Sequence, residues 1–148
     1  MFEHLLVPLD TSEVAERALP YATELAAQLG SRLHLVSVVS IWTEDARPDG
    51  GDTFRLESAL ARAREYLDVL QRRLRLEGLD VVTGVRQGDV AEEVLRCAGE
   101  WDCDVIVMCT HGRTGPGRWV YGSVADRLLR QSGIPVLLVR AQEATRQD

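Results

Sequence analysis

The sequence predicts an α/β fold in which a doubly wound, five-stranded parallel sheet carries helices on both faces. Short apolar, β-rich runs alternate with longer segments of helical periodicity along the chain. The apolar runs lack strict polar–apolar alternation, which is typical of strands covered on both faces. The chain has 148 residues, of which 45% are hydrophobic, and this suits one domain with a sizeable core. Strands that alternate with helices pair in parallel through right-handed crossovers, so we expect a single domain over 1–148.

The first strand is expected at His4–Pro8, an apolar run that ends in proline. The segment Asp10–Glu13 then resembles a capping box at the start of a helix. Apolar residues recur at three- to four-residue spacing over 14–29, and Gly30 ends this pattern. Pro20 inside the pattern predicts a kink or an end to the first helical turns.

The middle of the chain predicts a strand, a loop, a long helix and another strand. Leu33–Val39 is the second β-rich run. A polar stretch with proline and glycines predicts a flexible loop over 43–53. Leucines and an alanine form an apolar stripe over 56–74, so a long helix is expected there, ending at Gly78. Val81–Val85 predicts the third strand.

The last third of the chain predicts two more helices and two more strands. The expected elements are a helix over 90–98 capped by Gly88-Asp89, a strand Asp104–Met108, a glycine-rich loop, a helix Ser123–Gln131, a strand Val136–Arg140 and a polar tail over 141–148. Val136–Arg140 should lie at the sheet edge, and an apolar edge favours pairing with another chain.

Composition excludes several classes of function. The net charge of −6 disfavours nucleic acid as a partner, because phosphate backbones attract clustered positive charge. No apolar run approaches the roughly 18 residues of a membrane span, and the amino terminus lacks the basic region of a secretory signal. All 17 basic residues are arginine, which excludes Schiff-base chemistry and a P-loop lysine.

The sequence predicts structural roles for the three cysteines and for two of the histidines. Cys97, Cys103 and Cys109 are odd in number and form no C-x-x-C pair, so neither a disulfide framework nor a zinc site is indicated. Reduced thiols in a cytoplasmic protein are the simpler interpretation. His4 and His34 lie in or beside strands, where we expect structural histidines whose nitrogens are hydrogen-bonded.

Ligands of doubly wound sheets bind outside the carboxyl ends of the strands, where the strand order reverses. The candidate loops here are Pro8–Asp10, Val38–Ser40 and Met108–Ser123. Asp10 is either the N-cap of the first helix, which the local sequence favours, or a ligand of a ribose hydroxyl.

The third loop is rich in glycine and leads to a helix N-terminus, which suits phosphate. Ser123 offers a hydroxyl there, and Arg113 and Arg118 add positive charge. The alternative is a plain capping box between Ser123 and Asp126. Neither the G-x-G-x-x-G nor the Walker A pattern is present.

Several motifs together resemble the universal stress protein family over essentially the whole chain. The ATP-binding members carry a G-x2-G-x9-G-(S/T) signature. This chain matches it with Gly112 and, after nine residues, with Gly122-Ser123. His4–Asp10 is similar to the family's first segment, and 110–115, 122–125 and 135–139 resemble its carboxyl-terminal half. The resemblance implies a Rossmann-like fold of the adenine nucleotide alpha hydrolase type.

The resemblance also implies that ATP is held in the crevice where the strand order reverses. Asp10 would accept hydrogen bonds from the ribose, the Val38 backbone would contact adenine, and the start of the last helix would hold the phosphates, with Mg²⁺ bound through them. The residues implied to bind the nucleotide are Pro8, Leu9, Asp10, Val38, Met108, Cys109, His111, Gly112, Arg113, Gly122, Ser123, Val124 and Ala125.

A regulatory, ATP-binding stress-response module that forms a homodimer through 136–140 is the function that this resemblance implies. No catalytic residue and no protein metal ligand is assigned. A slow ATPase or nucleotidyl-transfer enzyme is one alternative, and a nucleotide-free dimeric stress protein is another.

Two residues depart from the family signature. Cys109 replaces its first glycine, and Ala125 stands where some members carry a second hydroxyl. A cysteine is costly at position 109 only if the backbone there needs a positive φ. Three interpretations of Cys109 remain open: the thiol points into the protein, it obstructs the nucleotide, or it is redox-active with a lowered pKa.

Overall fold

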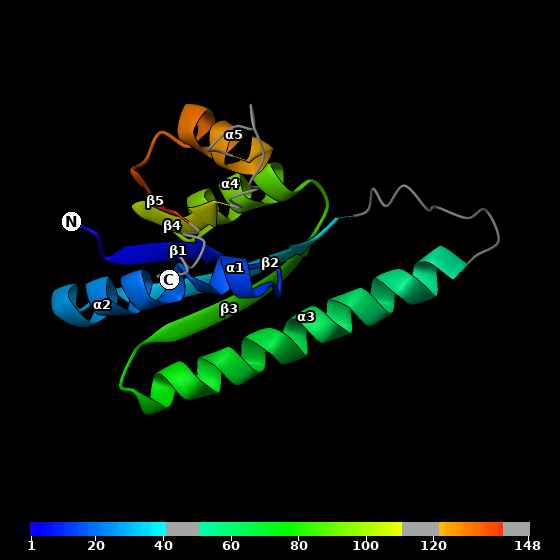
Figure 1. The fold of residues 1–148 in the computed structure, drawn as a ribbon, viewed down its shortest axis with the longest axis horizontal. Helices are drawn as coiled ribbons and strands as arrows, with labels where there is room; N and C mark the ends of the chain where they lie inside the picture. Colours follow the sequence, from blue (N-terminus) through cyan, green and yellow to red (C-terminus); the bar gives the residue numbers. More distant parts are fainter. Residues whose placement is uncertain (41–50, 111–121, 141–148) are drawn as a thin grey trace, which may run out of the picture.

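The computed structural model describes residues 1–40, 51–110 and 122–140, and it confirms a doubly wound α/β fold (Figure 1). Five parallel strands form one sheet in the order β3-β2-β1-β4-β5. The strands are β1 (His4–Pro8), β2 (Arg32–Val39), β3 (Val81–Gln87), β4 (Val105–Thr110) and β5 (Val136–Arg140). The helices are α1 (Glu13–Glu16), α2 (Leu19–Leu29), α3 (Gly51–Leu76), α4 (Val90–Glu100) and α5 (Ser123–Gln131).

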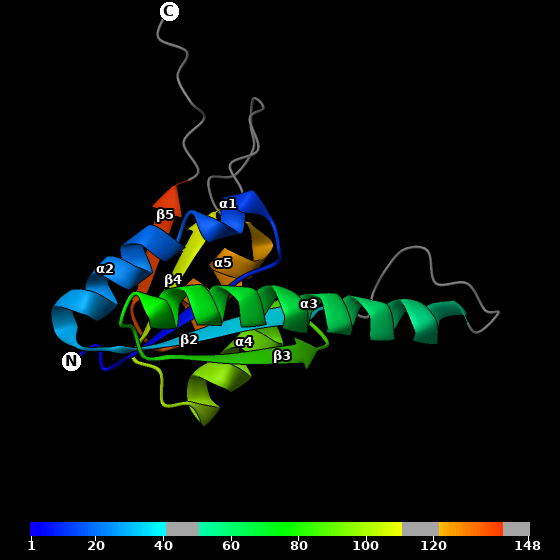
Figure 2. The same ribbon diagram turned by 90° about the horizontal axis from the view of Figure 1, so that it is seen from below.

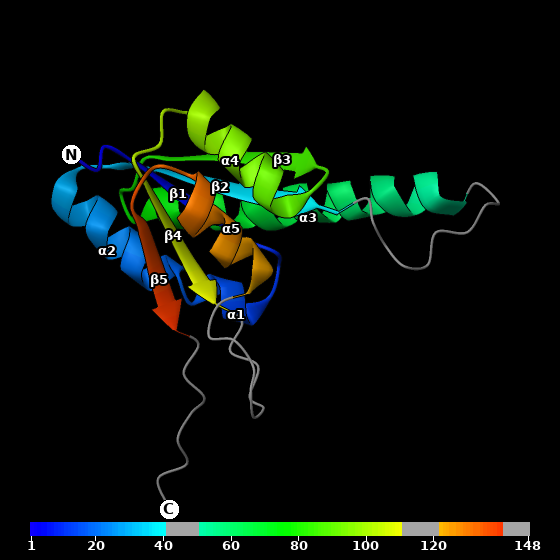
Figure 3. The same ribbon diagram turned by 90° about the horizontal axis from the view of Figure 1, so that it is seen from above.

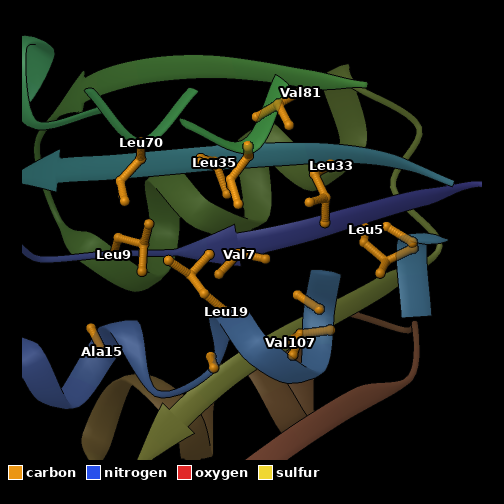
Figure 4. Close-up of a cluster of buried hydrophobic side chains, with 14 of the residues drawn as sticks. Leu5, Val7, Leu9, Ala15, Leu19, Leu33, Leu35, Leu70, Val81 and Val107 are labelled. Atoms are coloured by element: carbon orange, nitrogen blue, oxygen red, sulfur yellow. The ribbon is translucent and has the colours of Figure 1, made fainter. Parts of the chain in front are cut away.

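The helices form one layer on each face of the sheet. Figures 2 and 3 view these layers from opposite sides, with α1, α2 and α3 in one layer and α4 and α5 in the other. Leu5 and Val7 of β1 pack toward the first layer, and Leu6 between them packs toward the second. Figure 4 shows the larger of the two cores, where leucines from the strands meet α2 and α3. Both faces are buried, which explains the unbroken apolar runs in the sequence.

The first helical segment is divided as the proline predicts. Pro20 lies in the first turn of α2, where it lacks only an N–H that would be unpaired anyway. Gly30 ends α2 with a φ of +67°, a conformation that glycine adopts without strain. The expectation that Asp10 caps the helix is wrong. Ser12 is the N-cap of α1, and its hydroxyl accepts from the Ala15 N–H at 3.1 Å.

The long helix begins earlier than the sequence indicates. A loop is expected over 43–53, but α3 already begins at Gly51, so the prediction is wrong for 51–53. Poor helix formers are tolerated in a first turn, because its N–H groups lack helical partners in any case. The amino-terminal part of α3 extends beyond the sheet (Figures 1 and 2). The rest of that loop and the tail over 141–148 lie outside the described residues.

The central strands separate toward their carboxyl ends. Pairing between β1 and β4 ends at Leu6 and Ile106, whereas pairing between β1 and β2 continues to Pro8 and Val36. The strand order reverses between β1 and β4, because the chain runs outward from β1 in both directions. This fold therefore opens a crevice at the position where doubly wound sheets bind ligands. β5 lies at one edge of the sheet, as predicted.

Candidate functional site

A cleft of about 190 Å³ lies where β1 and β4 separate. Its walls are mostly aliphatic, and Asp10 is the one carboxylate among the described lining residues. The lining residues are Pro8, Leu9, Asp10, Ala15, Val36, Val38, Val90, Val94, Met108, Cys109 and Val124. A narrow cleft with apolar walls and one polar group at its rim suits a flat, apolar ring that carries a polar substituent.

The two cores meet at this cleft. Leu9 and Cys109 belong to the core under α1 and α2, whereas Met108 and Val94 belong to the core under α4 and α5. Each core is covered by its own helical layer, and residues of both cores line the gap between β1 and β4. The strand register therefore positions the walls of the cleft.

The start of α5 lies at the mouth of the cleft, because Val124 is among the lining residues. The capping-box alternative for Ser123 and Asp126 is wrong. Gly122 is the N-cap, Ser123 is the first helical residue, and Asp126 instead pairs with Arg130 at 3.1 Å. No side chain caps this helix among the described residues. Its first N–H groups are thus available to an anion.

An ion pair joins α5 to α4 beside the cleft. The Arg127 guanidinium donates to the Asp89 carboxylate at 2.7 Å, and the same carboxylate oxygen accepts from the Glu92 N–H at 3.0 Å. The Glu92 N–H and then the guanidinium hold the pKa of Asp89 below its usual value. Asp89 is the N-cap of α4, as predicted, so this pair positions two helix N-termini together. No sequence motif indicated that Arg127 would form an ion pair beside the cleft.

Asp10 follows β1 and is exposed at the rim of the cleft. Its carboxylate accepts from the Ser12 N–H at 3.0 Å and from the Ser12 hydroxyl. The next residue, Thr11, has a φ of +69°, a left-handed conformation that β-branched residues rarely adopt. Such strained residues cluster at ligand-binding sites, where the surrounding structure holds them.

Cys109 lies within β4, and its backbone does not have a positive φ. Its thiol is buried with 7% exposure and donates to the Thr110 carbonyl at 3.6 Å. Burial raises the pKa of the thiol, while Arg17 opposes this effect. The redox interpretation requires a lowered pKa, and the direction of this shift is the opposite. The cysteine also imposes no backbone strain at this position.

The structure brings most of the sequence-predicted binding residues to one place. Pro8, Leu9, Asp10, Val38, Met108, Cys109 and Val124 line the cleft. Gly122 and Ser123 are exposed at the start of α5, and Ala125 is buried against α4. His111, Gly112 and Arg113 lie outside the described residues, as does Arg118. Sequence reasoning missed Ala15, Val36, Val90 and Val94, which have the pattern of ordinary core residues.

Comparison with known proteins identifies the family. The model of the universal stress protein family matches residues 1–140, and the chain belongs to this family. A universal stress protein of Thermus aquaticus is 33% identical over 148 residues, which cover 95% of this chain and 100% of that protein.

Solved structures of universal stress proteins are similar to this chain. One from Burkholderia pseudomallei has a TM-score of 0.78 and 34% identity, and the match covers 93% of this chain and 96% of that chain. Another, solved in complex with cAMP, has a TM-score of 0.65 and 20% identity, with 95% and 98% of the two chains covered.

Two absences hold for residues 1–40, 51–110 and 122–140, which the structure describes. None of their helices is long and apolar enough to cross a membrane. They include no group of three or more histidine, cysteine or acidic side chains arranged to hold a metal ion. Cys97, Cys103 and Cys109 are all free thiols.

Proposed function

We propose that this universal stress protein binds an adenine nucleotide, ATP, in the cleft between β1 and β4, and that it acts as a regulatory module of the stress response. The observation that carries the proposal is the cleft itself, which joins aliphatic walls to the start of α5, where no described side chain caps the helix, at the strand-order reversal. The proposal assigns no catalytic residue.

The cleft suits the base and sugar of a nucleotide. Its aliphatic side chains, among them Val38 and Met108, offer flat apolar contact to a purine. The main chain of Pro8–Asp10 forms the adjoining rim, and the Asp10 carboxylate accepts hydrogen bonds from hydroxyl groups. Adenine would lie against Val38, and the ribose would lie beside Asp10.

The phosphates would lie over the start of α5. A side chain added at Gly122 would meet no described atom within 4 Å, so there is room above this helix end. Backbone N–H groups over 122–125 and the Ser123 hydroxyl would donate to phosphate oxygens. His111, Gly112 and Arg113 belong to the proposed phosphate and ribose contacts. Mg²⁺ would be bound through the phosphates.

A relative supports a nucleotide ligand for this type of fold. The universal stress protein solved with cAMP holds a cyclic adenine nucleotide, and its fold matches nearly the whole of this chain. Denaturing the purified protein and identifying released small molecules by mass spectrometry tests the proposal directly. We expect adenine nucleotide in the released fraction and ATP binding in calorimetry of the emptied protein. Absence of both results would contradict the proposal.

Two substitutions at the start of α5 test the placement of the phosphates. Gly122→Val fills the space above the helix end, and Ser123→Ala removes one donor. Both residues are exposed, so the variants should fold. Hydrogen bonds to charged groups are worth about 1.5–3 kcal/mol, so ATP affinity should fall about 10- to 100-fold and AMP affinity should fall less. Unchanged ATP binding in both variants would refute this placement.

We also propose a cytoplasmic homodimer that forms through β5. The strand is at the sheet edge, and its Leu137 is 39% exposed. An unpaired apolar edge favours antiparallel pairing with a second copy. Leu137→Arg should shift the protein toward monomer in sedimentation equilibrium at micromolar concentration. Leu129→Arg on α5, where the leucine is 45% exposed, is the matched control and should stay dimeric. A monomeric wild type would end the dimer proposal.

A further inference from the structure

An ion pair connects the starts of two helices at the mouth of the cleft. α4 and α5 lie side by side on one face of the sheet (Figure 3), and the Arg127 guanidinium of α5 donates to the Asp89 carboxylate of α4 at 2.7 Å. Val90, which follows Asp89, lines the cleft, and so does Val124, three residues before Arg127. Residues three apart are neighbours on one side of a helix, so the Arg127 side chain begins on the side of α5 that faces the cleft. The pair therefore lies beside the place proposed for the phosphates.

Asp89 brings a negative charge to this place. Its carboxylate caps α4 and accepts from the Glu92 N–H at 3.0 Å. This hydrogen bond, and then the guanidinium of Arg127, hold the pKa of Asp89 below its usual value. The larger of these two causes does not depend on Arg127, so the carboxyl group stays ionised at neutral pH even without its arginine.

An unpaired carboxylate beside a phosphate site opposes binding. It would repel the phosphates of a nucleotide, and the repulsion grows with the charge that the phosphates carry. Arg127 makes the pair neutral, so the N–H groups at the start of α5 determine the sign of the potential there. The Arg127 and Asp89 side chains are 40% and 41% exposed, and dissolved salt should therefore weaken the effect.

A second ion pair in α5 offers a comparison within the same helix. Arg130 pairs with Asp126 at 3.1 Å, and its side chain is 76% exposed. Asp126 lies in the first turn of α5, but it follows Val124 by two residues and therefore lies on the other side of the helix from the cleft. The two pairs share their chemistry and their helix, and they differ in whether the carboxylate faces the proposed phosphates.

We infer that Arg127 determines the preference of the cleft for nucleotides with several phosphates, and that it does so through Asp89, whose charge it cancels at the mouth of the cleft. This inference rests on the proposed nucleotide binding. It makes Arg127 a positioning residue that acts on the ligand through a neighbouring carboxylate and that is not itself a phosphate ligand.

The first test measures the affinity of wild type and Arg127→Met for ATP, AMP and adenosine by calorimetry. Methionine keeps an apolar stem and removes the charge. ATP affinity should fall about tenfold and AMP affinity about threefold, whereas adenosine affinity should not change because adenosine has no phosphate. The loss for ATP should shrink as the ionic strength rises. Equal losses for all three ligands would mean that the substitution disturbs the packing of α5, and this would overturn the inference.

The second test asks whether Arg127 acts through Asp89. Asparagine is as good an N-cap as aspartate and still accepts from the Glu92 N–H, so Asp89→Asn should fold. Combining Asp89→Asn with Arg127→Met should restore ATP affinity to within about threefold of wild type. A double variant that binds ATP as weakly as Arg127→Met would show that the guanidinium contacts the phosphates itself, and this would overturn the inference.

Arg130→Met is the matched control, because it removes the same charge from the same helix and exposes a carboxylate that faces away from the cleft. It should bind all three ligands as wild type does. A tenfold loss of ATP affinity in this control would mean that any positive charge on α5 has the effect, which contradicts the role of Asp89. If wild type binds none of the three ligands, the proposed function fails and the inference fails with it. Binding by wild type without a selective loss in Arg127→Met overturns the inference alone.

Discussion

The two ends of the sheet are built from the same strands, yet one is closed and the other is open. At the amino end, the Asp104 carboxylate accepts from the N–H groups of Glu3 and His4 at 2.8 and 3.1 Å, which joins β4 to β1. At the carboxyl end, β1 and β4 are no longer paired beyond Leu6 and Ile106. The sheet thus opens a cleft, the proposed nucleotide site, at one end while the other end holds the strands together.

An aromatic stack closes the amino end on the α4 side. His4 Nδ1 and His34 Nε2 are 3.0 Å apart, and His34 stacks on Trp101 with ring centroids 5.3 Å apart. The Arg86 guanidinium lies 5.5 Å from the centroid of the Trp101 ring. The expectation that both histidines are fully hydrogen-bonded is wrong, since His34 Nδ1 has no partner among the described residues.

The two ends differ in how open they are to a ligand. Asp10 and Tyr66 at the carboxyl end line a cavity of about 500 Å³, whereas His34 at the amino end is 4% exposed and lies beneath a tryptophan ring. His34 stays neutral in the folded protein, because burial disfavours its charged form. The stability of the fold should therefore depend on pH.

The largest predicted effect is acid destabilisation at the closed end. Burial, followed by His4 and Arg32, lowers the pKa of His34 from 6.5 to about 4, while Asp80 opposes this shift. As the pH falls below 6.5, the unfolded chain binds a proton at this position before the folded chain does. Stability present above pH 6.5 is lost progressively as the pH falls to 4, by about 3 kcal/mol in total.

His34→Phe tests this prediction, because phenylalanine keeps a ring against Trp101 and removes the titrating group. Urea unfolding between pH 7.5 and 4 should show a shallower loss of stability in the variant than in wild type. Equal slopes would show that His34 does not carry the effect. ATP affinity at pH 7.5 should be the same in both proteins, because the substitution lies at the opposite end of the sheet from the cleft.

The second-largest predicted effect is a loss of stability when the packing of Trp101 against β3 is disturbed. A Cβ added at Gly84 would lie 2.7 Å from Trp101 Cη2, and the ring is held by His34 and Arg86. Gly84→Ala should therefore destabilise the protein by about 1–2 kcal/mol. Gly99→Ala in α4 is the matched control, since its Cβ would meet nothing within 4 Å, and it should stabilise by up to about 1 kcal/mol. If both substitutions have the same effect on the urea midpoint, the close approach of position 84 to Trp101 does not determine stability.

Most of the strands and the helices that cover them could be predicted from the sequence, because burial on both faces of the sheet produces apolar runs. The bounds of β1, β5 and α5 agree with the predicted His4–Pro8, Val136–Arg140 and Ser123–Gln131. β3 extends further than predicted, since Arg86 and Gln87 pair with β2 through main-chain atoms. Backbone pairing does not depend on side-chain polarity, so hydropathy misses such strand ends.

The open end was predictable only in part. Carboxyl ends of parallel strands meet at one edge, and this is sufficient to bring Asp10, Val38 and Met108 together. The cavity of about 500 Å³ that Asp10, Ala59 and Tyr66 line depends on where α3 crosses β2. The helical stripe indicates which face of α3 is buried, but it does not show that Ala59 and Tyr66 line a cavity there. That arrangement is set by tertiary packing alone.

The smallest predicted effect lies in the cleft itself, at the residue that departs from the family signature. Cys109 has no positive φ, and its thiol points toward the Thr110 carbonyl within the core, so a glycine there should not change the path of the main chain. Cys109→Gly should therefore leave ATP affinity within about threefold of wild type, a change of at most about 0.6 kcal/mol. Burial raises the pKa of the thiol, and alkylation of Cys109 in native wild type should accordingly be slow with or without ATP. Wild type that fails to bind ATP, rescued by glycine, would show instead that the thiol obstructs the nucleotide. It would also show that the open end of the sheet is closed to this ligand by a single side chain.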